Sequence, residues 1–181
     1  MILRRFRPKS QDRNIGELYG AIVAQARSVA FYGDYGVPDT VEGRFDLIVL
    51  HLVLVLVRFG SDEQTGRGIG QQLFDVFCSD LDGNLREMGV GDLAVPKRMR
   101  RFGEAFYGRQ AAYLAALAAT DEGELEKALA RNIFSGRDDD CGAARLARYA
   151  RAALAQFEQQ SEDALLRGDV VFPRPEAIAT V

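Results

Sequence analysis

The chain contains one run, from Leu47 to Val57, in which every side chain is Leu, Ile or Val except His51. A helix needs about 20 apolar residues to cross a bilayer, so this run is too short to span a membrane. A segment that is apolar on all sides and too short for lipid must be buried inside protein. The run therefore predicts a central element that the rest of the chain surrounds.

The apolar run fits either a buried strand or a buried helix, because periodicity alone does not separate the two. Its β-branched residues suit a strand of a parallel sheet. The flank favours a helix, because Asp39 and Glu42 have the spacing of a capping box. Large apolar residues then recur at steps of three and four. We predict one helix over residues 40–59, apolar on nearly all sides.

The fold class that these patterns predict is all-α: a single-domain bundle of about six helices around the central apolar helix. Asn14 and Glu17 form a second capping-box candidate. The predicted helices cover residues 14–31, 40–59, 73–88, 94–119, 121–134 and 141–166. An extended C-terminal tail follows over residues 170–175, because proline restricts itself and the residue before it. Residues 1–13 are predicted to form a flexible basic arm, and residues 14–181 the helical domain.

Composition agrees with one globular domain, since the 181 residues are 48% hydrophobic and 27% charged. A net charge of −3 gives no electrostatic reason to expect nucleic-acid binding. Cys78 and Cys141 lack metal-ligand spacing and predict two free, partly buried thiols in a reducing compartment. The N-terminus lacks the apolar core of a signal peptide, so we expect a cytoplasmic protein.

His51 is the one histidine of the chain, and any catalytic role would have to start from it. Without a second histidine or a cysteine at a workable spacing, it does not predict a zinc site. We expect a neutral imidazole that is hydrogen-bonded in the core, with a general base as the alternative. Gly66, Gly68 and Gly70 are interpreted as a glycine-rich loop that forms a flexible entry to the next helix and not as a nucleotide site, because Gln71 stands where a dinucleotide fingerprint needs its third glycine. We predict no catalytic centre, no metal and no cofactor.

Two acidic groups are candidates for cation binding. Asp80 and Asp82 lack the glycine and the downstream glutamate of a calcium loop, so we interpret them as solvated helix residues. Asp138, Asp139 and Asp140 stand just before a predicted helix, where carboxylates cap free N–H groups. We prefer this capping role to a magnesium site.

Basic residues crowd the first turns of the helix predicted over residues 94–119. They are Lys97, Arg98, Arg100 and Arg101. Cations at a helix N-terminus oppose the helix dipole and cost stability. The cluster is either a solvated helix face or a docking patch for an anionic partner, such as lipid headgroups, a nucleic-acid backbone or an acidic protein surface.

Three segments give the chain a family resemblance. They are Y-G-D-Y-G-V-P-D-T-V-E-G-R-F-D-L at residues 32–47, G-Q-Q-L-F-D-V-F-C-S-D-L-D-G-N-L-R-E-M-G-V-G-D-L-A-V-P-K-R-M at residues 70–99, and F-Y-G-R at residues 106–109. Over residues 19–117 the chain resembles the ubiquinol-cytochrome c chaperone family. The resemblance implies a helical assembly factor of the ubiquinol-cytochrome c reductase complex, with newly made cytochrome b as client and the ribosome and a partner subunit as further contacts. The strong excess of Arg over Lys indicates a bacterial member.

A partner-binding surface is predicted from this resemblance and from the cost of exposed aromatic and clustered cationic side chains. Its residues are Tyr32, Tyr35, Asp39, Arg44, Lys97, Arg98, Arg101, Tyr107 and Arg109. Arg44 and Arg109 have an alternative role, which is to pair with a buried carboxylate inside the fold.

Two functions of different class remain. One is an assembly chaperone for cytochrome b; the alternative is an all-α enzyme or carrier with an apolar ligand pocket near His51. The N-terminal arm mixes apolar and cationic residues, which suits weak contact with the inner face of an anionic membrane. Its residues are Ile2, Leu3, Arg4, Arg5, Phe6, Arg7 and Lys9.

Overall fold

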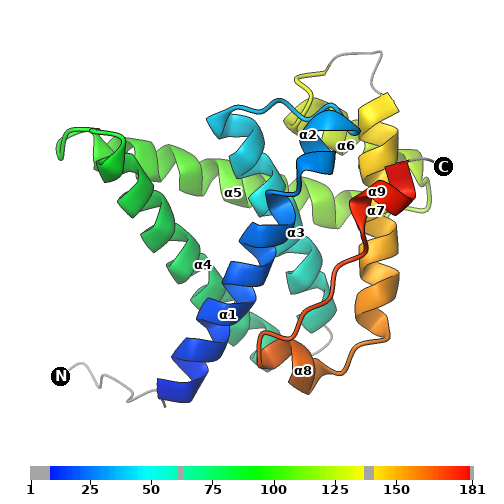
Figure 1. Cartoon of the computed structure of the whole chain (residues 1–181), viewed down its shortest axis with the longest axis horizontal. Coiled ribbons are helices and arrows are strands. Elements are labelled where there is room, and N and C mark those ends of the chain that lie inside the picture. Colours follow the sequence, from blue (N-terminus) through cyan, green and yellow to red (C-terminus); the bar gives the residue numbers. More distant parts are fainter. Residues whose placement is uncertain (1–8, 61–62, 137–140, 180–181) are drawn as a thin grey trace.

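Figure 1 shows the computed structural model, which describes residues 9–60, 63–136 and 141–179. Within these ranges the chain forms nine helices and no strand, so the all-α prediction is confirmed. The helices are α1 (Lys9–Ala26), α2 (Val29–Gly33), α3 (Val41–Phe59), α4 (Glu63–Glu87), α5 (Val95–Ala118), α6 (Gly123–Asn132), α7 (Cys141–Glu158), α8 (Glu162–Leu166) and α9 (Pro175–Ala179). None of the helices in the described ranges is both long and apolar enough to cross a membrane.

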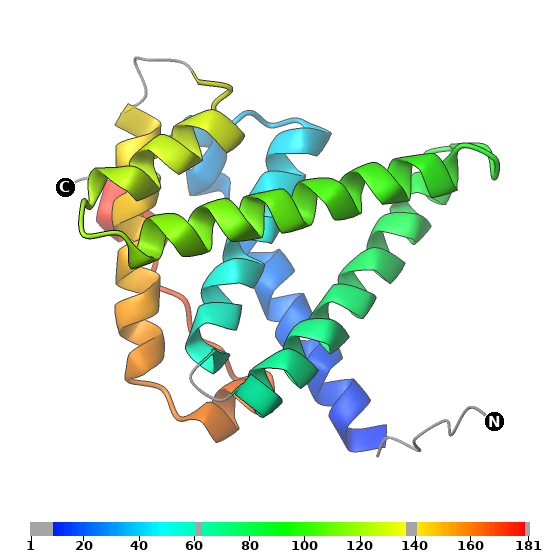
Figure 2. The same ribbon diagram turned by 180° about the vertical axis from the view of Figure 1, so that it is seen from behind.

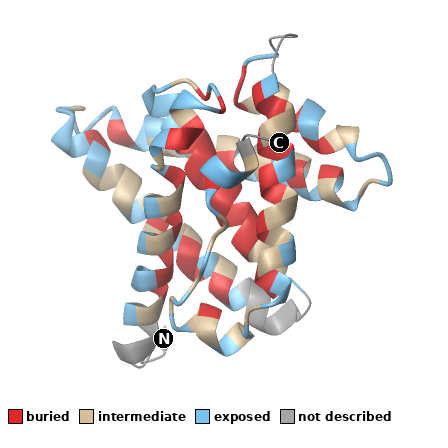
Figure 3. Cartoon of the chain, turned by 45° about the vertical axis from the view of Figure 1, so that its right-hand side comes forward, coloured by how far each residue is buried: buried red, intermediate tan, exposed pale blue. Residues whose placement is uncertain are grey.

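Helix α3 is the centre of the molecule. It packs against α1, α4, α5 and α7, and Figure 3 shows buried residues concentrated along it. Leu47 and Leu50 have no exposed surface, and Leu52 is 1% exposed. Each fully buried Leu, Ile or Val contributes about 1.5–3 kcal/mol, which outweighs the modest helix propensity of the β-branched residues. The prediction of a central apolar helix is confirmed.

The predicted capping box at the start of α3 is wrong by one residue. Thr40 is the N-cap, and its side-chain oxygen accepts a hydrogen bond from the Gly43 N–H at 3.1 Å. Asp39 stands before the cap and pairs with Arg44 instead. Both Asp and Thr are good N-caps, so the sequence alone did not decide between adjacent candidates.

The second predicted capping box is also wrong. Helix α1 begins at Lys9, so Asn14 lies inside the helix and does not cap it. The helix takes the last residues of the predicted arm, and the rest of the arm, residues 1–8, lies outside the described residues. The helix expected to continue to Phe31 is divided into α1 and α2.

The glycine-rich segment before residue 71 is helical, and the predicted loop there is wrong. Helix α4 begins at Glu63 and includes the three glycines. Ile69 and Leu73 are buried, and Gly70 faces the Leu56 side chain. Tertiary packing thus overrides the low helix propensity of glycine. The acidic residues 138–140, predicted to cap the helix that begins at residue 141, lie outside the described residues.

The C-terminal part differs from the single helix predicted over residues 141–166. Helix α7 ends at Glu158, and Ser161 caps the separate α8 by accepting a hydrogen bond from the Ala164 N–H at 3.2 Å. Gly168, with φ of +89°, follows α8. Residues 169–174 form no helix or strand, and α9 then covers Pro175–Ala179, which was not predicted.

Candidate partner-binding site

His51 lies in a fully buried hydrogen-bond network. Its Nδ1 bonds to the Leu47 carbonyl oxygen at 2.7 Å, and its Nε2 bonds to the Tyr149 hydroxyl at 3.0 Å. A carbonyl oxygen only accepts, so Nδ1 carries the proton and Nε2 accepts from Tyr149. Gln25 donates to the Tyr149 oxygen at 2.9 Å. Both ring nitrogens therefore have partners.

This environment keeps the imidazole neutral. Burial lowers the pKa of His51 to about 4, and the hydrogen bond to Leu47 opposes the shift. The rings of Phe31, Tyr149 and Phe172 surround His51 with centroid distances of 5.3, 5.5 and 5.4 Å. The prediction of a hydrogen-bonded core imidazole is confirmed, and aromatic rings fill the space where the carrier hypothesis places an apolar pocket.

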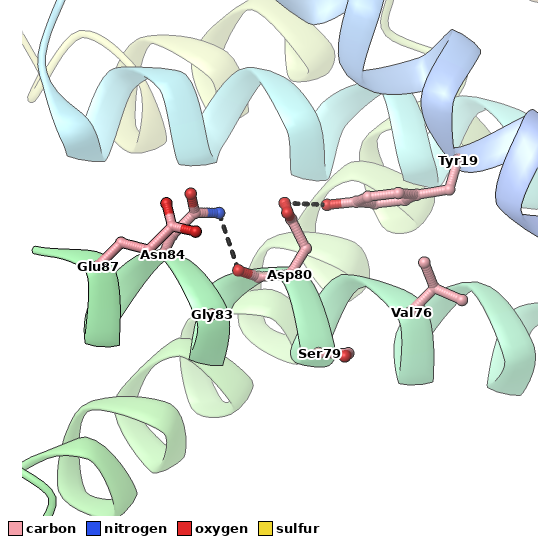
Figure 4. Close-up of a pocket in the computed structure, with 7 residues that line it drawn as sticks. All are labelled: Tyr19, Val76, Ser79, Asp80, Gly83, Asn84 and Glu87. Carbon is pink, nitrogen blue, oxygen red and sulfur yellow. Dashed lines mark hydrogen bonds between the residues drawn. The ribbon is translucent and has the colours of Figure 1, made fainter.

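An open pocket of about 440 Å³ lies between α1 and α4. Figure 4 shows its lining residues, Tyr19, Val76, Ser79, Asp80, Gly83, Asn84 and Glu87. The Tyr19 hydroxyl donates to the Asp80 carboxylate at 2.8 Å. Burial raises the pKa of Tyr19, and the hydrogen bond to Asp80 and the charge of Asp80 raise it further. Asp80 is thus a half-buried partner of α1 and not the solvated residue that the sequence predicted.

Cys78 and Cys141 are free thiols, as predicted, but the predicted partial burial holds for Cys78 and is wrong for Cys141. Burial raises the pKa of the half-buried Cys78, so its thiol is less easily ionised, whereas Cys141 is exposed at the start of α7. Across the described ranges, no group of three or more His, Cys, Asp or Glu side chains could hold a metal ion.

Tyr35 does not belong to a surface. It is 1% exposed, and its hydroxyl donates to the Pro175 carbonyl oxygen at 2.8 Å. Its ring packs against Phe31 and Tyr149, and burial raises its pKa to about 12. The expectation of an exposed tyrosine is wrong because the C-terminal tail covers this position.

The predicted residues Tyr32 in α2, Asp39 in the α2–α3 loop and Arg44 in α3 have local partners. Asp39 and Arg44 form an ion pair of 2.7 Å whose side chains are about half exposed, and the hydrogen bond from Arg44 lowers the pKa of Asp39. The Arg44 guanidinium lies 5.8 Å from the centroid of the half-buried Tyr32 ring. Tyr32 also donates to the Ala26 carbonyl oxygen. The exposed pair remains accessible to a partner.

The basic cluster at the start of α5 is exposed. Lys97, Arg98 and Arg101 face solvent, and none has an ion pair within the described ranges. Arg100 approaches Glu104 at 3.7 Å, with both side chains largely exposed. Solvent-exposed pairs of this kind contribute little to stability. The structure therefore keeps these cations available for contact.

Tyr107 and Arg109 point to opposite sides of α5. Tyr107 is 55% exposed, and its ring rests on Phe74 and Phe106. The Arg109 side chain is only 22% exposed and turns towards α3. Residues two positions apart on a helix do not share a face, which explains the difference.

Arg109 pairs with a carboxylate in the core, which was the alternative role considered for it. Its Nε lies 2.6 Å from Oδ1 of Asp46, whose side chain is 5% exposed, although the contact is poorly directed for a hydrogen bond. Burial raises the pKa of Asp46 to about 6, and Arg109 opposes this shift. The guanidinium also lies 5.5 Å from the Phe45 ring centroid. Arg109 is therefore a structural residue.

The predicted residues do not converge on one surface. The turn between α4 and α5, next to the basic cluster, projects away from α2 in Figures 1 and 2. Phe45 near the start of α3 packs on Phe102, which directly follows the basic cluster on α5. Tyr35 and Arg109 are inside the fold. Among the described residues, three exposed regions remain: the Asp39–Arg44 pair, the start of α5 with the preceding turn, and the outward face around Tyr107.

The comparison with known proteins gives a consistent group of relatives. The chain is 26% identical over 155 residues to ubiquinol-cytochrome c reductase complex assembly factor 1 of Mus musculus, covering 84% of this chain and 52% of that protein. The protein of this name in Xenopus laevis is 26% identical over 157 residues, with 86% and 78% covered. The Homo sapiens protein is 26% identical over 155 residues, with 84% and 52% covered. The chain thus spans about half the length of the mouse and human relatives.

A solved structure shares the fold. The crystal structure of the Cbp3 homolog from Brucella abortus matches with a TM-score of 0.81 and 38% identity, over 97% of this chain and 98% of that chain. The sequence profile described as Ubiquinol-cytochrome C chaperone matches residues 33–172. Because this profile covers the greater part of the sequence, the chain belongs to the ubiquinol-cytochrome c chaperone family.

Proposed function

We propose that this protein is a non-enzymatic chaperone that binds newly made cytochrome b and promotes assembly of the ubiquinol-cytochrome c reductase complex. The observation that carries the proposal is membership of the family, whose profile covers residues 33–172. Relatives named as assembly factors of this complex support it. His51 is neutral, and both of its ring nitrogens are hydrogen-bonded inside the core, which fits a protein that binds a partner better than one that transfers protons.

The outward face of α5 is the client surface that the structure favours. Tyr107 is 55% and Leu114 41% exposed, and the residues between and after them on this face are small: Gly108, Ala111, Ala115 and Ala118. No charged residue occurs from Gln110 to Ala119. An apolar client segment can pack here without burying an unpaired charge.

Packing holds the main aromatic residue of this surface in place. The Tyr107 ring has centroid distances of 5.2 Å to Phe74 and 5.4 Å to Phe106. A side chain that is ordered before binding loses less conformational entropy on binding. The exposed Asp39–Arg44 pair, beside the half-buried Tyr32 ring, offers a separate polar contact for a partner.

Assembly in cells that lack the gene tests this function. We expect the amount of assembled reductase to fall strongly without the protein and to return with the wild-type chain. The double variant Tyr107→Gln with Leu114→Gln should restore much less, because polar side chains weaken an apolar contact. The matched control is Val29→Gln with Val171→Gln, which changes two exposed apolar residues away from α5.

The same assay tests the proposed function and the proposed client surface on α5 separately. Normal reductase without the protein would exclude the proposed function. Full restoration by the Tyr107 and Leu114 variant, with melting curves like that of the control, would exclude the surface alone. His51→Gln keeps volume and hydrogen-bonding capacity and should restore assembly; loss of assembly with a stable fold would reopen a chemical role for His51.

A further inference from the structure

Apolar side chains are exposed where α4 turns into α5. Leu93 is 99% exposed and Met88 is 60% exposed, although Met88 continues the apolar spacing of α4. Figures 1 and 2 show this turn projecting from the body of the molecule. A single exposed leucine is ordinary, but two large apolar residues at a projecting tip indicate a contact surface.

The turn is held by regular backbone hydrogen bonds. Gly89, with φ of +78°, forms a left-handed stop after α4, and the Val90 N–H donates to the Leu85 carbonyl at 3.0 Å. The Ala94 N–H donates to the Gly91 carbonyl at 2.8 Å. Leu85 and Val95 are buried on either side. The fold therefore presents Leu93 outward from a fixed turn.

The cations next to these residues carry the opposite sign to the whole molecule. Residues 93–101 contain four cations and no acid, whereas the chain has a net charge of −3. The neighbouring Asp92 is paired at 2.6 Å with Arg86, which also pairs with Asp82. Helix α5 also has no acidic residue in its first turn and no side-chain cap, and of the four cations Arg100 alone has an ion pair within the described ranges, with Glu104 at 3.7 Å. An anionic surface would be met by this end of the molecule first.

We propose that the α4–α5 tip, formed by Met88, Leu93, Lys97, Arg98 and Arg101, docks on the surface of a bilayer that contains anionic lipid. In such a bilayer the negative headgroups lie directly above the apolar acyl chains. The cations of the tip can therefore contact headgroups while the neighbouring apolar side chains enter the acyl region. An acidic protein surface would satisfy the cations but would need an apolar patch beside its acidic groups to take Leu93. The inference does not depend on the proposed function, because it concerns a different part of α5.

Vesicle flotation with the full chain tests the charges. We expect flotation with vesicles of phosphatidylcholine and phosphatidylglycerol, decreasing with salt, and none with phosphatidylcholine alone. The triple variant Lys97→Gln, Arg98→Gln, Arg101→Gln should bind at least about tenfold more weakly, because each cation near an anionic membrane contributes roughly fivefold to binding. The matched control changes three exposed cations elsewhere: Arg131→Gln, Arg148→Gln and Arg174→Gln.

A fluorophore at the tip tests the apolar contact directly. Leu93→Cys is labelled with an environment-sensitive dye in a chain that carries Cys78→Ala and Cys141→Ser. We expect the emission to shift to the blue with the anionic vesicles and to stay unchanged with the neutral ones. The label is at the most exposed apolar residue, so it reports whether this side chain leaves water.

Three results would overturn the proposal. One is equal flotation of the tip variant and its control. Another is flotation with an unshifted emission, which would assign membrane contact to another part such as residues 1–8; their deletion would then abolish it. The third is a blue shift that grows with protein concentration without vesicles, which would mean that a second copy of the chain covers Leu93.

Discussion

Replacing Arg109 by alanine is expected to lower the free energy of unfolding by about 3–5 kcal/mol. Its Nε lies 2.6 Å from the carboxylate of Asp46, and the side chains of Arg109 and Asp46 are 22% and 5% exposed. Removing the guanidinium leaves a carboxylate in the core without its counter-charge. The protein must then bury a lone charge or protonate Asp46, and both cost stability. Urea denaturation at pH 7 measures the change.

Two further variants define the origin of this effect. Arg98→Ala removes an exposed cation of the same helix without an ion pair, and we expect a change within about 0.5 kcal/mol. Asp46→Asn added to Arg109→Ala should recover part of the loss, because it removes the lone charge. If Arg109→Ala were as mild as Arg98→Ala, Arg109 would be a surface residue and its place in the candidate partner site would have to be restored.

His51 is expected to make the free energy of unfolding depend on pH, by an amount nearly as large as the effect of Arg109→Ala. The unfolded chain takes up a proton on its histidine as the pH falls below about 6.5. Burial lowers the pKa of His51 in the folded protein to about 4, so His51 stays unprotonated in the folded state until the pH falls to about that value. The unfolded state therefore binds more protons between these values, and stability falls as the pH falls through them. The loss reaches about 3 kcal/mol at pH 4.

Comparison with His51→Gln isolates this contribution. Asp46, whose pKa is raised to about 6, acts in the opposite direction, but it is present in both proteins and cancels in the difference. The stability advantage of the wild type over His51→Gln should shrink from pH 7 to pH 4. Because the chain has one histidine, its imidazole NMR signal is unambiguous. A titration with a midpoint near 6.5 would mean that the ring is not buried as described.

The sequence predicted the centre of the fold better than the ends of its helices. A long apolar run in a globular protein must be buried on all sides, and α3 is buried in this way. Helix ends depend on single hydrogen bonds, so Thr40 displaced Asp39 as the cap of α3. The segment with Gly66, Gly68 and Gly70 is helical and not a loop, because Ile69 and Leu73 pack into the core. Local helix propensity does not contain this tertiary packing.

The candidate site was less predictable, because exposure is decided by tertiary contacts. Tyr35 lies in a turn-rich segment that reads as surface, but the C-terminal tail, distant in sequence, accepts its hydrogen bond. Arg109 did carry a signal. Phe106 and Tyr113 are buried, and Arg109 stands three residues after one and four before the other, on the same helix face. A charged residue at such a position predicts a buried partner, which is Asp46.

Recovery of cytochrome b with the affinity-tagged chain from native membranes, soon after pulse-labelled synthesis, tests the proposed client most directly. We expect labelled cytochrome b to copurify with the wild-type chain and with the Val29→Gln, Val171→Gln control. Recovery should fall for the Tyr107→Gln, Leu114→Gln variant at unchanged protein stability. If the wild-type chain recovers no more labelled cytochrome b than untagged cells do, while other newly made membrane proteins copurify with it, cytochrome b is not its client.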